Sequence, residues 1–90
     1  NIDIDQNWQK FKIQFEEVHP GFFDRLKQKY PDLSEQYFKL SAYVRINLTT
    51  NESAQLLNVT LAAVKKSRHR LRKKFNLGTE DSLSEFVSGI

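Results

Sequence analysis

Hydrophobic residues in the first third of the chain recur with the spacing of a helix. Large apolar side chains come every three or four positions, at Ile4, Trp8, Phe11, Phe15 and Val18. This spacing predicts a helix over residues 5–18 with one apolar face. The turn at His19, Pro20 and Gly21 ends it, because proline disfavours helical geometry in the residue before it. A second helix is expected up to Pro31, with its apolar side chains at Phe22, Phe23, Leu26 and Tyr30.

The segment after Pro31 is apolar on more than one side. Ser34 is the expected N-cap of a helix over residues 35–47. The apolar residues of this helix are Tyr37, Phe38, Leu40, Ala42, Tyr43, Val44 and Ile46. A helix that is apolar on all sides is usually buried, so we expect this one at the centre of the core.

Two further helix patterns follow, separated by a tight turn at Asn58. Thr50 is the expected N-cap of the first, which ends near Leu57. Thr60 is the expected N-cap of the second, which is predicted over residues 61–76. Two adjacent helices joined by so short a connection favour a bi-helical unit.

The C-terminal part completes an all-helical pattern. Gly78 is expected to stop the preceding helix, since glycine is common just past a helix end. A last short helix is predicted over residues 81–87, with its inward side chains at Leu83, Phe86 and Val87. No segment shows the apolar and polar alternation of a strand. The predicted fold class is therefore all-α.

Composition limits the chain to one small core. Ninety residues with 39% hydrophobic content can fold as a single small domain. The absence of cysteine removes disulfides and thiolate metal sites and is compatible with the cytoplasm. Apolar runs of only a few residues exclude a membrane span, so no membrane contact is expected from this segment. Because the chain opens with Asn1, we expect it to be part of a longer protein.

Positive charge is concentrated in one predicted helix. Residues 61–75 contain seven basic residues and no acidic one, so the rest of a chain with net charge +3 sums to −4. The seven are Lys65, Lys66, Arg68, Arg70, Arg72, Lys73 and Lys74. Such one-sided charge indicates a polyanionic partner.

The turn between the two central helices has the residues of a helix-turn-helix. This motif needs a small residue where the helices approach, a residue tolerant of left-handed geometry in the turn, and apolar anchors. Ala54 is the small residue and Asn58 the turn residue, because asparagine accepts a positive φ more readily than most residues. The anchors are Leu57, Val59 and Val64.

A helical wheel divides the basic helix into faces. The inward stripe consists of Val64, Leu71 and Phe75. The outward half consists of Ala62, Lys65, Lys66, His69, Arg70 and Lys73, with Arg72 and Lys74 on the flanks. A helix with an apolar inner stripe and a cationic outer face is suited to the DNA major groove.

These faces predict two kinds of DNA contact. We assign the base-reading positions to Lys65, Lys66 and His69. We assign phosphate contacts to Arg70, Arg72, Lys73 and Lys74, together with Thr50 and Thr60. Arg68 lies near the apolar stripe on the wheel, and the sequence assigns it no role. One interpretation is that it pairs with a carboxylate of the neighbouring helix, with Glu52 as the candidate, rather than contacting DNA.

Four segments resemble the LuxR-type (GerE-like) DNA-binding domain of bacterial transcription regulators. They are LS (33–34), NLTTNESA (47–54), LNVT (57–60) and VKKSRHRLRKKF (64–75). The resemblance covers about residues 31–87. With the helices that precede it, the basic run is also similar to the C-terminal output domains of sensory regulators in the Bacteroidetes. Asn47 and Ser67 stand where the family commonly has Gly and His.

The resemblance implies a domain of four helices over residues 32–90, of which the third reads DNA. Residues 1–31 then form an extension of two further helices packed on the bundle. It implies a homodimer on two half-sites of double-stranded DNA, with the final helix often forming the dimer contact. The family position after the recognition-helix valine is Lys65, and its next base-facing positions fall on Lys66 and His69. The expected function is sequence-specific DNA binding as the output domain of a transcription regulator.

Enzymatic and metal chemistry find no support in the sequence. His69 has no nucleophile or carboxylate partner in any catalytic spacing, and two histidines without cysteine make no metal site. The neighbouring acids Glu16 and Glu17 do not face each other on a helix, and neither do Glu80 and Asp81. We interpret them as solvated or capping groups, and we expect neither catalysis nor a cofactor.

Two other functions fit the same basic helix. A sigma-factor-like promoter-recognition domain would also bind RNA polymerase. A helical interaction module would use its basic face to bind an acidic protein.

Overall fold

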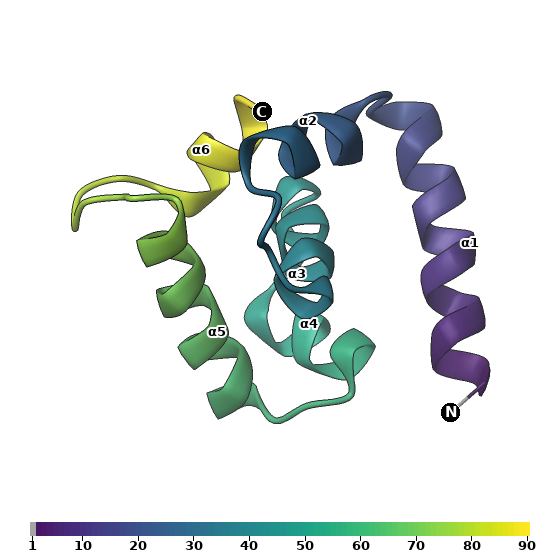
Figure 1. Ribbon diagram of the computed structural model, residues 1–90. Helices are drawn as coiled ribbons and strands as arrows, with labels where there is room; N and C mark the ends of the chain where they lie inside the picture. The colour runs from purple at the N-terminus through teal and green to yellow at the C-terminus, as the bar shows by residue number, and fades with distance from the viewer. Residues whose placement is uncertain (1) are drawn as a thin grey trace. The chain divides into compact units, whose positions relative to one another are not determined.

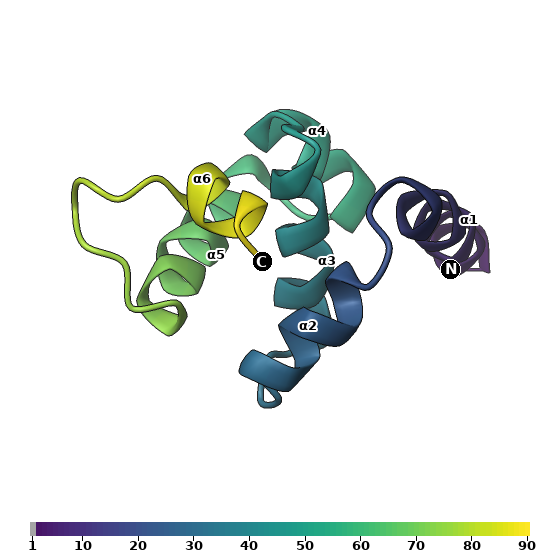
Figure 2. The same ribbon diagram turned by 90° about the horizontal axis from the view of Figure 1, so that it is seen from above.

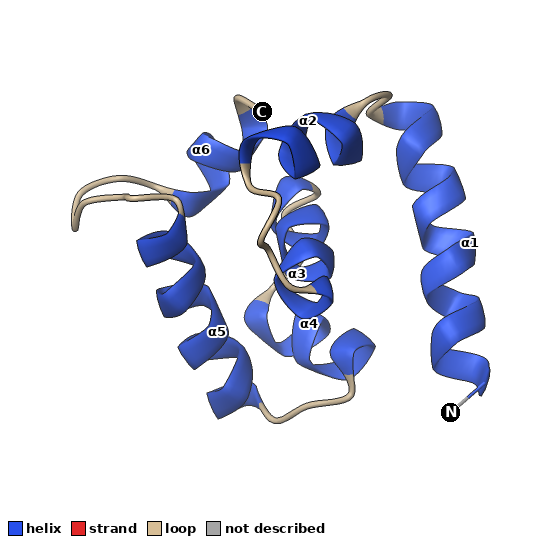
Figure 3. Cartoon of the chain, viewed as in Figure 1, coloured by secondary structure: helices blue, strands red, loops and turns tan. Residues whose placement is uncertain are grey.

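The computed structural model describes the backbone of residues 2–90 and the side chains of residues 7–90. All regular structure in this part of the chain is helical, as predicted (Figure 3). The chain forms two compact units, Asn1–Leu33 and Ser34–Ile90. The division at residue 31, with the extension packed on the bundle, stays a prediction. Every helix among the described residues is too short or too polar to cross a bilayer.

The first unit holds α1 (Ile2–Val18) and α2 (Phe22–Lys29), joined by a turn in which Gly21 has φ 80° (Figure 1). A cluster of aromatic rings lies within it. The ring of Phe15 lies 5.1 Å from that of Phe22 and 5.0 Å from that of Phe23, measured between centroids. The predicted apolar face of α1 is thus confirmed at Phe15, as is the burial of Phe22 and Phe23 in α2.

The prediction was wrong for Val18, whose side chain is 71% exposed. At 100° per residue, Val18 lies about 80° from Trp8 around the helix, at the margin of the apolar stripe. Trp8 itself is buried and Phe11 half-buried, so burial declines toward that margin. The side chain of Ile4 lies outside the described residues.

The second unit holds α3 (Glu35–Arg45), α4 (Thr50–Leu57), α5 (Leu61–Lys74) and α6 (Leu83–Ser88). Helix α3 contacts each of the other three, and α5 and α6 lie on the same side of it (Figure 1 and Figure 2). Residues 40–44 of α3 are all buried. The predicted central position of this helix is therefore confirmed within its unit, although the helix ends at Arg45 rather than at 47.

Three helices of this unit end in the same way. Asn47, Asn58 and Asn76 have φ of 62°, 57° and 59°, in the left-handed region that lets the chain leave a helix. The amide of the residue after each asparagine donates to the carbonyl five positions before it. The Val59 amide, for example, donates to the Ala54 carbonyl at 3.0 Å. The predicted turn role of Asn58 is confirmed. Helix α5 ends at Lys74 rather than at 76, and the residue that takes the left-handed conformation after it is Asn76, not the predicted stop Gly78.

The N-caps differ from prediction in one case. The cap of α4 is Thr49, not Thr50: the Thr49 Oγ1 accepts from the Glu52 amide at 3.0 Å, and the Glu52 carboxylate accepts from the Thr49 amide at 2.9 Å. Glutamate three residues after the cap makes this reciprocal pair possible for Thr49 only. For α5, the predicted cap Thr60 is confirmed, since its Oγ1 accepts from the Ala63 amide at 3.1 Å.

Candidate nucleic-acid interface

Helices α4 and α5 contact each other across a three-residue turn, residues 58–60. Ala54 of α4 is 4% exposed, as expected for the small residue at a close approach. Its carbonyl accepts the hydrogen bond from Val59 that closes the turn. The local sequence thus determines the turn: a left-handed asparagine ends α4, and a threonine cap starts α5 two residues later.

The inner stripe of α5 is buried as the wheel predicted. Val64 and Leu71 are fully buried and Phe75 is 3% exposed. The ring of Phe75 lies 4.8 Å from that of Phe86 in α6. These contacts fix the rotation of α5 about its axis, so they also determine which of its side chains face solvent.

The opposite face of α5 is exposed and cationic. All six residues of the predicted outward half are exposed: Ala62, Lys65, Lys66, His69, Arg70 and Lys73. Among residues 7–90, no carboxylate forms an ion pair with any of the four Lys and Arg residues in this set. We call these six residues the cationic face. It offers unneutralised donors to an anionic ligand.

The two flanking cations contact the protein itself. Arg72 Nη1 donates to the main-chain carbonyl of Asp81 at 2.6 Å, and its Nη2 donates to that of Gly78. The ammonium of Lys74 lies 5.4 Å from the ring centroid of Tyr37 in α3, within the range of a cation–π contact. Arg72 therefore holds the loop between α5 and α6, a role that its place on the wheel did not predict. Phosphate contact by these two residues stays a prediction.

Arg68 does not pair with Glu52, so that interpretation was wrong. The Glu52 carboxylate instead completes the capping box with Thr49. Arg68 is half-buried, and the described residues give it no ion pair. Burial, and secondarily the charge of Arg72, lower the pKa of its guanidinium.

The two threonines assigned to phosphates lie at the starts of α4 and α5. Thr60 is exposed and caps α5 through its hydroxyl. Thr50 is half-buried as the first residue of α4, next to the actual cap. Their contact with phosphate stays a prediction.

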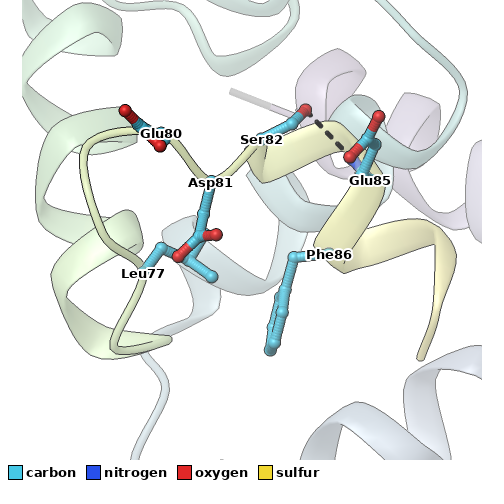
Figure 4. Close-up of a pocket in the computed structure, with 6 residues that line it drawn as sticks. All are labelled: Leu77, Glu80, Asp81, Ser82, Glu85 and Phe86. Atoms are coloured by element: carbon cyan, nitrogen blue, oxygen red, sulfur yellow. Dashed lines mark hydrogen bonds between the residues drawn. The ribbon is translucent and has the colours of Figure 1, made fainter.

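A second surface of this unit is acidic. A cavity of about 440 Å³ is lined by Leu77, Glu80, Asp81, Ser82, Glu85 and Phe86 (Figure 4). The Asp81 carboxylate accepts from the Gly78 amide at 2.7 Å, and the Ser82 hydroxyl accepts from the Glu85 amide at 3.2 Å. Asp81 thus binds a loop amide and caps no helix, whereas Ser82 is the N-cap of α6. Among the described residues, no cluster of His, Cys, Asp and Glu could hold a metal ion.

Glu16 also has a local role. Its carboxylate accepts from the Gly21 amide at 3.3 Å, across the turn that follows α1. Glu17 is exposed, which agrees with its interpretation as a solvated group, whereas Glu16 is half-buried and binds an amide in the turn.

No protein-family model, curated protein or solved structure matches this chain.

Proposed function

We propose that this chain is a sequence-specific, duplex-DNA-binding domain that places α5 in the major groove. We further propose that it is the output domain of a bacterial transcription regulator of the LuxR type, with α4 and α5 as its helix-turn-helix. The observation that carries the proposal is the cationic face, which lies opposite the buried stripe of α5, is exposed, and has no ion pair to any side chain of residues 7–90.

The shape of α5 supports this role. An α-helix with its side chains is about 10–12 Å wide, and the major groove of B-DNA is about 12 Å wide. Helix α5 spans 14 residues and is buried along one stripe only, so its opposite side is open along its length. A recognition helix of this kind contacts base edges mainly through its N-terminal half.

The N-terminal half of the cationic face contains the proposed base readers. Lys65 and Lys66 are exposed and can donate to guanine O6 and N7, which are acceptors in the major groove. His69 lies one turn further along and can donate or accept through its imidazole. Lysine donors favour G·C pairs at the positions that these residues read.

The later cations serve as phosphate contacts. Arg70 and Lys73 are exposed and form no ion pair with the described carboxylates, and both can reach the DNA backbone on either side of the groove. They contribute affinity that does not depend on sequence. Arg72 contributes indirectly, because it fixes the loop that follows α5.

Selection of duplexes from a random library, followed by affinity measurement, tests the proposal. The selected duplex and a scrambled one of equal composition are titrated with the chain at several salt concentrations. We expect the selected duplex to bind more tightly at every salt concentration. Failure to enrich any sequence would contradict specific recognition.

Two variants locate the binding surface. Replacing both readers (Lys65→Ala with Lys66→Ala) removes two exposed cations from the cationic face and should abolish the preference. The matched control replaces two exposed cations of α2 (Lys27→Ala with Lys29→Ala) and should keep the preference for the selected duplex.

A competition experiment separates DNA from an acidic protein as the partner. If polyglutamate displaces the selected duplex as effectively as competing DNA does, the cationic face instead binds an acidic protein.

A further inference from the structure

The cationic face is interrupted by apolar side chains at one place only, the first turn of α5. Ala62 is exposed within the cationic face, and its neighbour Leu61 is 44% exposed. On a helix, residues three and four positions apart are surface neighbours. Leu61 therefore lies beside Lys65, while Ala62 lies beside both Lys65 and Lys66. We call Leu61 and Ala62 the apolar step.

The exposure of the apolar step is not explained by packing. The inner stripe already anchors α5 through Val64, which is fully buried one turn after the cap. A leucine with 44% of its surface exposed gives up much of the free energy that burying its side chain would supply. It sits next to the two lysines that are proposed to read bases, where a polar residue would be equally compatible with the helix.

One group in the major groove matches an apolar surface at this place. Each base pair presents hydrogen-bonding atoms there, and only thymine adds an exposed methyl, at C5. A small side chain such as that of Ala62 allows the helix to approach the base closely, and alanine is among the residues that contact this methyl. Leu61 points about 100° away from Ala62 around the helix axis, so it borders Lys65 on the other side and adds a separate apolar contact.

We propose that the apolar step contacts the C5-methyl group of a thymine, next to the G·C pairs read by Lys65 and Lys66. This inference rests on the proposed DNA-binding function and specifies its ligand further. The preferred half-site then contains a T·A pair beside a guanine. Specificity at this pair comes from burial of a methyl group, not from a hydrogen bond.

Replacing thymine by deoxyuridine tests the inference with the unaltered protein. The probe is the duplex of highest affinity from the random library, in which each thymine is replaced in turn. This removes one methyl group and leaves every hydrogen-bonding atom of the base in place. We expect one position per half-site at which affinity falls about fourfold, as for loss of one buried group of methyl size.

Protein variants then connect that position to the apolar step. With both residues made polar (Leu61→Ser with Ala62→Ser), thymine and deoxyuridine at that position should bind equally. The control is Leu56→Ser, which alters an equally exposed leucine of α4, at 43% exposure, and should keep the fourfold difference. If thymine and deoxyuridine bound this control variant equally well, the methyl contact would not be made by α5.

The outcomes separate the two proposals. If the chain prefers its selected duplex but tolerates deoxyuridine at every position, the thymine inference is overturned and DNA recognition stands. A fourfold effect that persists in the double serine variant also overturns it. If no duplex is preferred at all, the proposed function itself fails.

Discussion

Arg72 and Asp81 are joined by a hydrogen bond of 2.6 Å, from Nη1 of the arginine to the main-chain carbonyl of the aspartate. The other terminal nitrogen of the same guanidinium donates to the carbonyl of Gly78. The Asp81 carboxylate in turn accepts from the Gly78 amide at 2.7 Å. One side chain of α5 therefore organises the loop that leads into α6, in a helix whose other cations mostly face solvent.

Replacing this arginine should destabilise the fold. In Arg72→Ala, two carbonyls lose a charged donor, and we expect the free energy of unfolding to fall by about 1–2 kcal/mol, given their partial exposure. Urea denaturation measures this. The control Arg70→Ala removes an exposed cation of the same helix and should change the free energy of unfolding by less than about 0.5 kcal/mol. Equal losses in the two variants would contradict the role assigned to Arg72.

The left-handed asparagine between α4 and α5 gives a second prediction. In Asn58→Ala, alanine must adopt the φ of 57°, which costs alanine more free energy than asparagine. We therefore expect the free energy of unfolding to fall by about 1 kcal/mol. Asn58→Gly should be as stable as the original chain or more so. The control Asn51→Ala changes an exposed helical residue and should leave the free energy of unfolding unchanged. Thermal and urea unfolding of all three variants provide the comparison.

Two buried serines should respond differently to loss of their hydroxyl groups. Both are fully buried, but the Ser41 hydroxyl donates to the Tyr37 carbonyl at 2.9 Å, whereas the Ser53 Oγ has no hydrogen-bond partner among the described residues. A buried hydroxyl without a partner is destabilising. We expect Ser53→Ala to raise the free energy of unfolding by up to about 1 kcal/mol, and Ser41→Ala to leave it unchanged or lower it. A loss of stability in Ser53→Ala would mean that its hydroxyl is satisfied.

Much of the second unit follows from side-chain periodicity. The stripe of Val64, Leu71 and Phe75 is buried as predicted, and the six residues opposite are exposed. Both outcomes depend on the rotation of one helix, which its apolar residues determine. Errors arose at the margins of such stripes. Ile46 was predicted to be one of the apolar residues of a helix over residues 35–47. It lies at the C-terminal end of α3, and its side chain is 37% exposed.

Contacts between elements could not be predicted in the same way. Arg72 binds two carbonyls whose positions depend on the path of an irregular loop, and neither carbonyl has a signature in the sequence. The approach of Lys74 to Tyr37 joins helices that are far apart along the chain. The supposed pair of Arg68 and Glu52 failed because a local capping box competes for the same carboxylate, and the glutamate three residues after Thr49 could have indicated this.

The phosphate contacts proposed for the C-terminal half of α5 predict a change in salt dependence. Each phosphate contact adds about 0.9 to the slope of log affinity against log salt concentration. Lys73→Ala should therefore reduce the magnitude of that slope by about 0.9, with the selected and the scrambled duplex alike. The control Lys27→Ala removes an exposed cation of α2 and should leave the slope unchanged. An unchanged slope in Lys73→Ala would exclude that residue as a phosphate contact.

Amide resonance mapping tests the central claim most directly. The isotope-labelled chain is titrated with its selected duplex, and the chemical-shift change of each backbone amide is recorded. We predict the largest changes between residues 61 and 73, along the cationic face and the apolar step, with little change at residues 80–86 around the acidic cavity. Changes confined to residues 80–86 or to α1, with α5 unaffected, would contradict recognition of DNA by α5.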